Sequence, residues 1–365
     1  MHTKEHLREL QSYPLDIKIK LTKQRIREWI NEFGEDGVYV SFSGGKDSTV
    51  LLDIVRQDYP NVTAVFCDTG LEFPEIRQFV KRFDNVVWLK PEKNFKQVIN
   101  EYGYPFISKR VSKRIAAAQN YLLTFEELPK NIEELFSMHS DAPANAKMLF
   151  GTLEHKENGI PTGEASKMYN FSRWKFFVTS PFKVSDMCCY IFKKKPMNKY
   201  AKESGKKPIT AQMTDEGELR LNRWLTYGCN AFNSTHPMSN PMSFWTEQDV
   251  LHYIKRYNLP IANVYGEIVP EEDGQLKGQM SLEDFGICEN CAPLKTTGEK
   301  RTGCVFCGYG CHREKPGEGR FERLKQTHPQ IYDYIFKSTE DGGLGYKQVV
   351  DWINENNGKG TIIRY

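Results

Sequence analysis

The hydrophobic and polar positions of the first hundred residues alternate between helical and strand-like spacing. Residues 16–33 carry apolar side chains at helical intervals, and Gly34 then ends the predicted helix. Three short apolar runs predict buried strands at residues 38–42, 62–67 and 86–89. Helical patterns at 49–57 and 74–83, and a helix that begins near Asn94, come between or after them. This order predicts an α/β fold, with a parallel twisted sheet and helices on both faces.

The pattern weakens further along the chain. Residues 125–175 contain several Pro and Gly breakers and predict an irregular insertion, whereas helical spacing returns at 246–257 and at 321–336. Residues 271–319 are rich in Gly, Cys and charge, which predicts an irregular Cys-rich segment that a metal could organise. We therefore expect an N-terminal helical segment (1–33), an α/β domain (34–270) and a Cys-rich segment followed by C-terminal helices (271–365).

Composition narrows the class of protein. The 365 residues are 39% hydrophobic and 13% aromatic, enough for a sizeable core, and the net charge of +3 neither requires nor excludes a nucleic-acid partner. The first residues lack the apolar core of a signal peptide, and no stretch approaches the roughly 18 apolar residues of a membrane span. These features predict a cytoplasmic protein without a membrane partner.

The turn after the first predicted strand has the chemistry of an anion site. It reads Ser43-Gly44-Gly45-Lys46-Asp47-Ser48 and opens into a helix, so backbone N–H groups and the helix dipole face the turn. The glycines allow close approach of an oxyanion, the serines add hydroxyl donors and Lys46 adds positive charge. Asp47 would repel phosphate, so we expect it to cap the helix or to help hold Mg²⁺. The spacing is not that of a Walker A loop.

Together with two later segments, this turn resembles a known family. It looks like the PP-loop of the N-type ATP pyrophosphatases, which have the adenine nucleotide alpha-hydrolase-like fold. The stretch from Phe66 to Glu75, with Asp68-Thr69-Gly70 and Glu72-Phe73-Pro74, is similar to the second-strand motif of the phosphoadenosine phosphosulfate (PAPS) reductase family. Residues 241–250, with Trp245-Thr246 and Asp249-Val250, resemble a later motif of that family, and the match continues to Tyr265.

The resemblance implies that ATP, adenylyl sulfate or PAPS binds at the turn, with the adenine near residues 66–70. It implies nucleotide contacts from the turn, Ser43 to Ser48, and from Asp68, Thr69, Gly70 and Glu72, with Lys46 and Asp47 as catalytic residues. A third family motif is imperfect at residues 211–220, where Glu216 and Arg220 fit but Ala211 and Gly217 do not. Arg220 is a candidate anion ligand there, and a solvated helix of alternating charge is the alternative.

The cysteines suggest a metal centre. Cys188-Cys189 together with Cys304 and Cys307 look like the ligand set of adenylyl sulfate reductases that hold a [4Fe–4S] cluster, and four thiolates suit such a cluster. Cys288 and Cys291 with Cys304 and Cys307 have instead the spacing of a zinc ribbon. Cys188 and Cys189 could also be buried apolar residues without metal. Cys311 would then be a spare ligand or a reactive thiol.

The family's C-terminal motif with a nucleophilic cysteine has no counterpart, because the last 54 residues contain no cysteine. We therefore expect an ATP pyrophosphatase-type enzyme that adenylates an acceptor and supports sulfur transfer, with a sulfur donor protein and a nucleic-acid acceptor as candidate partners. A sulfonucleotide reductase with a different nucleophile is the first alternative. A regulatory module that binds nucleotide without turnover is the second.

Overall fold

The computed structural model describes residues 2–127, 129–271, 292–358 and 363–365. The chain divides into two compact units, each formed by two separate stretches of sequence. Unit 1 contains residues 1–91 and 193–304, and unit 2 contains residues 92–192 and 305–365.

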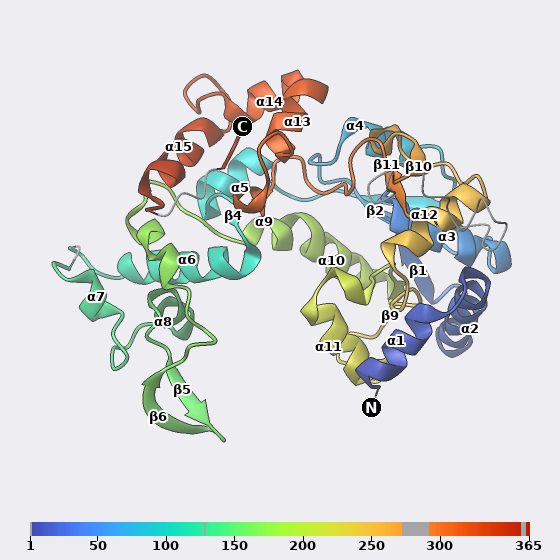
Figure 1. Cartoon of the computed structure of the whole chain (residues 1–365), viewed down its shortest axis with the longest axis horizontal. Helices are drawn as coiled ribbons and strands as arrows, with labels where there is room; N and C mark the ends of the chain where they lie inside the picture. The colour runs from blue at the N-terminus through green and yellow to red at the C-terminus, as the bar shows by residue number, and fades with distance from the viewer. Residues whose placement is uncertain (1, 128, 272–291, 359–362) are drawn as a thin grey trace, which may run out of the picture. The chain divides into compact units, whose positions relative to one another are not determined.

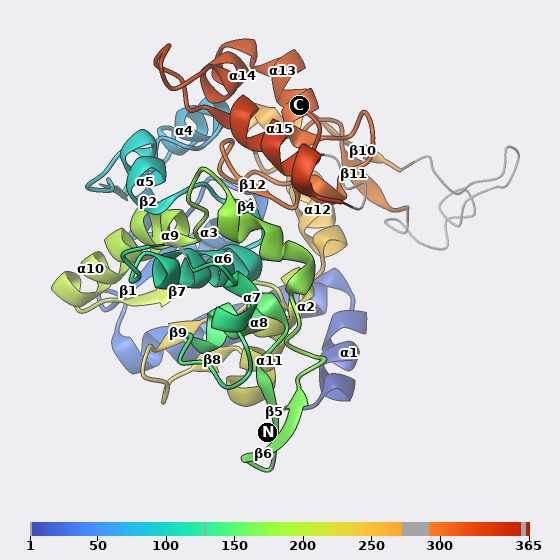
Figure 2. The ribbon, with the colours of Figure 1, turned by 90° about the vertical axis from the view of Figure 1, so that its left-hand side faces the viewer.

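Unit 1 is built around a six-stranded sheet with the order β3-β2-β1-β7-β9-β8 (Figures 1 and 2). Neighbouring strands are parallel except β8, which is antiparallel to β9. The strands are β1 (Val38–Ser41), β2 (Ala64–Cys67), β3 (Val86–Leu89), β7 (Lys207–Ile209), β8 (Asn230–Ala231) and β9 (Met238–Ser239). A separate antiparallel pair is formed by β10 (Ile268–Pro270) and β11 (Leu294–Thr296).

Helices cover both faces of this sheet. They are α1 (Lys4–Ser12), α2 (Leu15–Phe33), α3 (Lys46–Asp58), α4 (Pro74–Val80), α10 (Lys195–Ser204), α11 (Glu218–Tyr227) and α12 (Glu247–Arg256). On β1, Val38 and Val40 are fully buried on one face, while Tyr39 points to the other and meets Tyr200 of α10 edge to face. The fold is therefore the predicted α/β class, with a central sheet buried on both sides.

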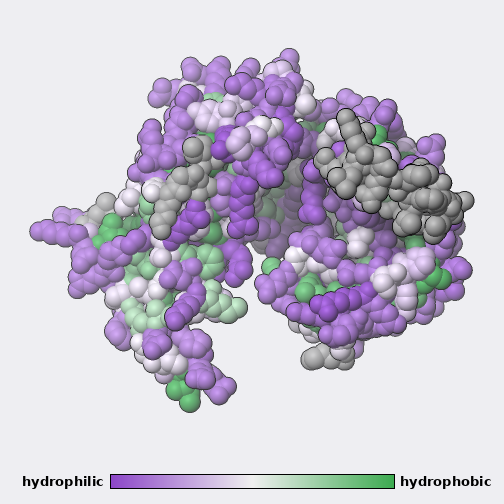
Figure 3. Space-filling model, viewed as in Figure 1, coloured by the Kyte–Doolittle hydropathy of each residue, from purple (hydrophilic) through white to green (hydrophobic). Residues whose placement is uncertain are grey.

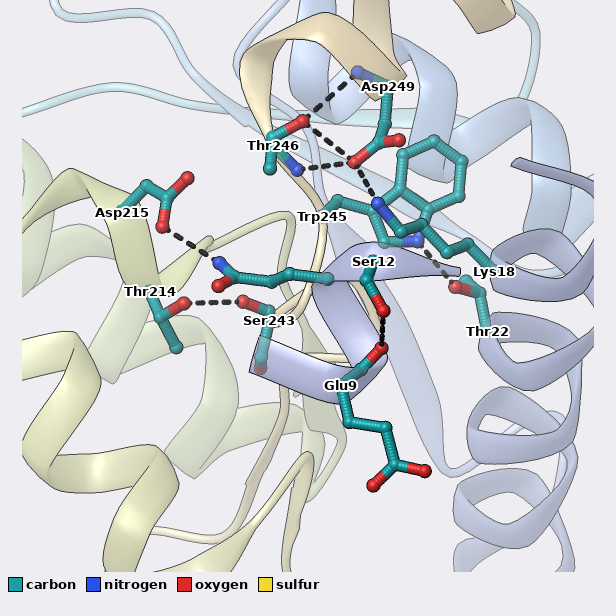
Figure 4. A network of polar contacts seen from close by, with 11 residues as sticks. Glu9, Ser12, Lys18, Thr22, Thr214, Asp215, Ser243, Trp245, Thr246 and Asp249 are labelled. Atoms are coloured by element: carbon teal, nitrogen blue, oxygen red, sulfur yellow. Dashed lines mark hydrogen bonds and ion pairs between the residues drawn. The ribbon is translucent and has the colours of Figure 1, made fainter. Parts of the chain in front are cut away.

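Hydrogen bonds and an ion pair connect the two N-terminal helices, α1 and α2, to the rest of unit 1 (Figure 4). The ammonium of Lys18 on α2 lies 2.7 Å from the Asp249 carboxylate of α12, and both side chains are largely buried. The same carboxylate accepts from Thr246 and completes the capping box at the start of α12. Nearby, the indole N–H of Trp245 donates to the Thr22 hydroxyl. Residues 1–33 are therefore part of unit 1 rather than a separate segment.

Unit 2 is mainly helical. Its helices are α5 (Phe95–Tyr102), α6 (Lys109–Leu122), α7 (Ile132–Leu135), α8 (Ala144–Phe150), α9 (Met187–Cys189), α13 (Arg320–Thr327), α14 (Pro329–Phe336) and α15 (Tyr346–Asn356). Its strands form two short pairs: β4 (Phe106–Ile107) with β12 (Gly308–Tyr309), and the hairpin of β5 (Glu154–Glu157) and β6 (Ile160–Ala165). Phe106, Phe177 and Tyr346 are fully buried at its centre.

The early elements match the sequence prediction within a few residues, and the division into domains differs from it. The predicted boundaries at 33/34 and 270/271 fall inside unit 1, because α2 packs on α12 and β11 pairs with β10. The stretch 125–175, predicted to be irregular, contains the short elements α7, α8, β5 and β6 within unit 2. Among the described residues, no helix has the length and apolar character needed to cross a bilayer. The surface in Figure 3 is mostly hydrophilic, with small hydrophobic patches.

Candidate functional site

The turn between β1 and α3 requires glycine at its second position. Gly44 has φ of +70°, a left-handed conformation that residues with a Cβ rarely adopt. A Cβ placed there would lie 2.7 Å from Cγ2 of Val80 and 2.9 Å from Cγ2 of Ile76, both on α4. The turn therefore lies tightly against α4, which is the helix that follows β2.

Hydrogen bonds within unit 1 hold the loop of residues 43–48. The Ser43 and Ser48 hydroxyls are 3.0 Å apart, and the Ser43 N–H donates to the Ser48 Oγ. The Lys46 N–H donates to the hydroxyl of Tyr265, which in turn lies 2.6 Å from Oγ1 of Thr302. The first helical bond of α3 runs from Thr49 to Gly45. Within the described chain, the amides of Asp47 and Ser48 have no acceptor, as expected for the first turn of a helix.

The side chain of Lys46 is buried, with only 4% of its surface exposed. Its ammonium donates to Glu247 of α12 at 2.6 Å and to the carbonyl of Lys300 at 2.5 Å. The predicted phosphate ligand is thus paired with a carboxylate in this structure. Burial of an ammonium requires such partners. An anion would have to compete with Glu247 for this group.

Asp47 is the acidic group of the loop, and its Oδ1 is buried without a hydrogen-bond partner among the described residues. Burial raises the pKa of Asp47 to about 6. The neighbouring carboxylates of Glu216 and Glu247 add to the rise in pKa, whereas Lys46 and Arg301 oppose it. A buried acceptor without a donor is costly in a folded protein. The position therefore suits a cation or a donor brought by a ligand.

A cavity within unit 1 opens beside this loop, at the carboxyl ends of β1 and β2. Ligands of open α/β sheets bind at this edge, because the loops that follow parallel strands meet there. Of the predicted nucleotide-binding residues, Ser43 and Glu72 line the cavity. The other lining residues are Ser41, Phe42, Val65, Phe66, Cys67, Ile76, Lys193, Met197, Thr302 and Gly303.

The segment after β2 forms a tight turn that presents Glu72 to the cavity. Gly70 has φ of +73°, and the Thr69 hydroxyl donates to Oε1 of Glu72 at 2.6 Å. The other carboxylate oxygen of Glu72 is buried and has no hydrogen-bond partner in the described residues. Asp68 pairs instead with Arg77 of α4 at 2.8 Å and stabilises the turn. Glu72 is therefore the acceptor of this segment that faces the cavity.

Arg220 lies away from that cavity. It is on α11, where it pairs with Glu216 at 2.8 Å in an i,i+4 arrangement. It lines a separate small pocket with Thr214, Arg223 and Asn240. Arg220 is related to the loop only through its partner Glu216, whose carboxylate helps to raise the pKa of Asp47. The role of Arg220 as an anion ligand stays a prediction.

The predicted cluster ligands are divided between the units. Cys188, Cys189 and Cys307 belong to unit 2, where burial raises the pKa of Tyr309 and the three thiols raise it further. Cys304 is the last residue of unit 1. In the part of the chain that the structure describes, no three His, Cys, Asp or Glu side chains are arranged to hold a metal. Cys288 and Cys291, the other ligands of the zinc alternative, lie outside the described residues.

Cys311 is not an exposed thiol. Only 2% of its surface is exposed, and its Sγ lies 3.8 Å from the carbonyl oxygen of Cys307. Burial raises the pKa of the Cys311 thiol well above its usual range. The role of an accessible reactive thiol therefore does not fit its surroundings.

Residues that sequence reasoning did not assign to the site contact the loop directly. Within the loop, the backbone N–H of Lys46 donates to Tyr265, and the Lys46 ammonium donates to Glu247 and to the Lys300 carbonyl. Beside the loop, the hydroxyls of Thr302 and Tyr265 are hydrogen-bonded to each other. Tyr265 and Glu247 lie in the motif stretch already noted, which was a usable signal. Lys300 and Thr302 follow β11, and no local pattern indicated that this segment returns to the loop.

Residues 37–138 match the model of the phosphoadenosine phosphosulfate reductase domain. An adenosine 5'-phosphosulfate reductase of Staphylococcus haemolyticus is 22% identical over 245 residues, which cover 67% of this chain and 72% of that protein. An adenosine 5'-phosphosulfate reductase of Geobacillus kaustophilus is also 22% identical, over 233 residues that cover 60% of this chain and 92% of that protein.

A crystal structure of PAPS reductase from Candida auris, in a phosphate complex, aligns with a TM-score of 0.35 and 14% identity over 72% of this chain and 91% of that one. The matched domain begins just before β1 and includes the loop, β2 and the Glu72 turn. The similarity to the phosphoadenosine phosphosulfate reductase domain therefore covers the part of the chain that contains β1, the loop of residues 43–48 and the turn at Glu72.

Proposed function

We propose that this chain is an ATP pyrophosphatase-type enzyme, which transfers an adenylyl group from ATP to an acceptor in support of sulfur transfer. The observation that carries the proposal is the buried Oδ1 of Asp47, which has no hydrogen-bond partner among the described residues and lies beside the amides of Asp47 and Ser48, which have no acceptor among them. A carboxylate alone would repel a nucleotide phosphate. Next to a divalent cation it helps to hold the phosphates, so a carboxylate within an anion-binding turn favours a metal–triphosphate ligand.

The described residues of unit 1 suit an adenine nucleotide. Val65, Phe66, Ile76 and Met197 give the cavity apolar walls on which a purine ring can pack. The unpartnered carboxylate oxygen of Glu72 would accept a hydrogen bond from a ribose hydroxyl or from the adenine amino group. The amides at the start of α3 would then donate to phosphate oxygens.

Mg²⁺ fits this loop through Asp47. Mg²⁺ commonly takes one or two protein carboxylates and completes its shell with water and substrate phosphates, so a single protein ligand is sufficient. When bound, Mg²⁺ would neutralise charge on the pyrophosphate leaving group. Within the described residues, Glu216 and Glu247 are the carboxylates that act electrostatically on Asp47, and they would raise the local affinity for a cation.

In the proposed reaction an acceptor oxygen attacks the α-phosphorus of ATP. A phosphorus–oxygen bond to the acceptor forms as the bond to pyrophosphate breaks, and no electron transfer is involved. The sulfur of a donor-protein thiocarboxylate would then displace AMP from the activated acceptor. Water would hydrolyse the resulting thioester, so that the donor's carboxylate is released, the sulfur stays on the acceptor and no oxidant or reductant is needed. The chain's contribution is to fix the phosphates with preset donors, which favours the in-line geometry and stabilises the charge that develops.

The substitution Asp47→Asn tests the proposal. We expect it to weaken Mg²⁺-dependent ATP binding by about tenfold or more, since a neutral amide is a poor Mg²⁺ ligand. Asp58→Asn, at the other end of α3 and outside the loop, is the matched control and should bind ATP like the wild type. Calorimetry with and without Mg²⁺ measures the ATP affinity of both variants and of the wild type. Equal affinity of the Asp47→Asn variant and the wild type for Mg²⁺–ATP would exclude the assigned role.

A second candidate is a sulfonucleotide reductase, because the two curated relatives named above are adenosine 5'-phosphosulfate reductases. Here a thiolate would attack the sulfate sulfur and release AMP, and a dithiol protein would then reduce the thiosulfonate and release sulfite. Cys67 lines the cavity, although burial raises its pKa to about 12 and makes its thiolate scarce at neutral pH. Mg²⁺-independent sulfite release that Cys67→Ser abolishes would favour this candidate over adenylation.

We also propose that Cys188, Cys189, Cys304 and Cys307 hold a [4Fe–4S] cluster, supported by the soft sulfur donors of this set. Protein purified without oxygen should be brown and contain about four irons and four acid-labile sulfides per chain. Cys188→Ser should lose both, while Cys229→Ser in unit 1 should keep them. Colourless protein with one zinc would favour the ribbon alternative.

A further inference from the structure

Unit 1 carries a concentrated patch of positive charge on and around α10. Residues 193–207 contain seven lysines and a single acidic residue, Glu203. The segment has a formal charge of +6, whereas the whole chain has +3, so the remaining residues together carry −3. We call this set the α10 lysine cluster: Lys193, Lys194, Lys195, Lys199, Lys202, Lys206 and Lys207.

The cluster is presented to solvent along one side of a well-anchored helix. The first five of these lysines are exposed, and the last two are half-buried. Lys195, Lys199 and Lys202 are spaced by four and three residues and so share one face of α10. Tyr200 packs instead against Tyr39 of β1, with ring centroids 5.2 Å apart, and holds the helix on the sheet.

The spacing of these charges suits a polyanion rather than a single phosphate. The helix rises about 1.5 Å per residue, so Lys195 and Lys202 are about 10 Å apart along its axis. Phosphates of one DNA strand follow one another at about 3.4 Å along the axis, so the row faces about three of them. Like charges at these helical spacings repel, and a bound polyanion would remove that repulsion.

One end of the cluster reaches the nucleotide cavity. Lys193 and Met197 both line the cavity beside loop 43–48, whereas Lys194, Lys195, Lys199 and Lys202 do not. Of the lysines in the cluster, a mononucleotide in the cavity could therefore contact only Lys193. The other lysines could contact a ligand that extends from the cavity along α10.

We propose that the α10 lysine cluster binds the phosphodiester backbone of a nucleic acid and that this nucleic acid is the acceptor of the nucleotide chemistry. The binding surface stands on the charge and exposure of α10 in unit 1. The role as acceptor rests on the proposed function, because only an adenylyl-transferring enzyme needs an acceptor at the cavity. A backbone held along α10 brings a base or sugar toward the α-phosphate.

The test compares two variants of full-length protein that each remove four positive charges. The cluster variant is Lys194→Gln, Lys195→Gln, Lys199→Gln and Lys202→Gln. The control is Lys20→Gln, Lys81→Gln, Lys90→Gln and Lys255→Gln, which are exposed lysines elsewhere in unit 1. Gln is used because it retains helix propensity close to that of Lys. Fluorescence anisotropy with one oligonucleotide sequence as RNA, single-stranded DNA and duplex DNA, between about 50 and 200 mM salt, gives the affinities.

We expect the wild type and the control to bind at least one oligonucleotide with similar affinity. The cluster variant should bind about tenfold more weakly or worse, and the slope of log K against log salt should fall by about 0.7 for each single-strand phosphate that the variant no longer neutralises. The form of nucleic acid bound most tightly identifies the acceptor class. Equal weakening in both variants, no binding by the wild type at about 50 mM salt, or equally tight binding of polyglutamate would each overturn the proposal.

ATP affinity measured in the same preparations separates the two proposals. The cluster variant should bind Mg²⁺–ATP like the wild type, because its four substituted residues lie outside the cavity lining. Oligonucleotide binding without any ATP binding by the wild type would reject the proposed function and leave the binding surface intact. ATP binding without oligonucleotide binding would reject the binding surface on α10 and leave the proposed function intact.

Discussion

Substitution of Gly44 by alanine gives a sharp test of how the loop is built. The change asks a residue with a Cβ to adopt φ of +70°, which costs about 1–2 kcal/mol for an L-residue. It also places a methyl group 2.7 Å from Cγ2 of Val80 and 2.9 Å from Cγ2 of Ile76. Overpacking of this kind costs about 1–3 kcal/mol. Together the two effects predict a loss of about 2–5 kcal/mol in the free energy of unfolding unit 1.

Gly205 provides the matched control for backbone strain alone. It has φ of +71°, and a Cβ placed there meets nothing within 4 Å. Gly205→Ala should therefore cost only about 1–2 kcal/mol, so Gly44→Ala should be less stable than it by about 1–3 kcal/mol. Urea unfolding measures the stability, and hydrogen exchange of peptides that cover β1 and α3 localises the loss to the loop.

The functional readout is nucleotide affinity. To relieve the steric overlap, the Gly44→Ala loop must move away from α4, which misplaces the amides at the start of α3. We expect Gly44→Ala to weaken Mg²⁺–ATP binding by about tenfold or more and Gly205→Ala to leave it unchanged. If the two variants unfolded at the same urea concentration and bound ATP equally, the close packing of the loop on α4 would be refuted.

Four further outcomes follow from the interactions within unit 1. Lys18→Met should lower the free energy of unfolding by about 3–5 kcal/mol, because it leaves the largely buried Asp249 carboxylate without its ion-pair partner. Lys23→Met, also on α2, breaks a partly exposed pair with Asp58 of α3 and should lower the free energy of unfolding in urea by less than about 1 kcal/mol. Glu72→Gln should weaken binding of adenosine itself by about tenfold, since a neutral amide is the weaker acceptor, and an unchanged calorimetric affinity would remove Glu72 from the nucleoside site. Mg²⁺-dependent ATP affinity should rise between about pH 5 and 7, because Asp47, with its pKa of about 6, must lose its proton to bind the cation. The same carboxyl should lower stability as pH rises from about 4 to about 6, since the folded state holds that proton more tightly than the unfolded chain, and both trends should vanish in the Asp47→Asn variant.

Local pattern was sufficient for the first half of the nucleotide-binding unit. The order of strands and helices up to β3, the Gly44 turn and the Asn94 cap of α5 all depend on interactions between residues close in sequence. Hydrophobic periodicity and cap chemistry act over a few residues, so they can be recognised without tertiary information. The same holds for the choice of an α/β fold with a parallel sheet.

Long-range interactions decided the rest. No local pattern showed that Glu247 and Lys300 would take the ammonium of Lys46, or that Tyr265 would accept from the loop, because these partners are some 200 residues or more away in sequence. The division into units likewise follows from which segments pack together rather than from changes in composition. Sequence determined the chemistry available at the turn, because its residues are adjacent along the chain. Tertiary structure decided which of these groups are already paired, because pairing depends on which distant segments fold against them.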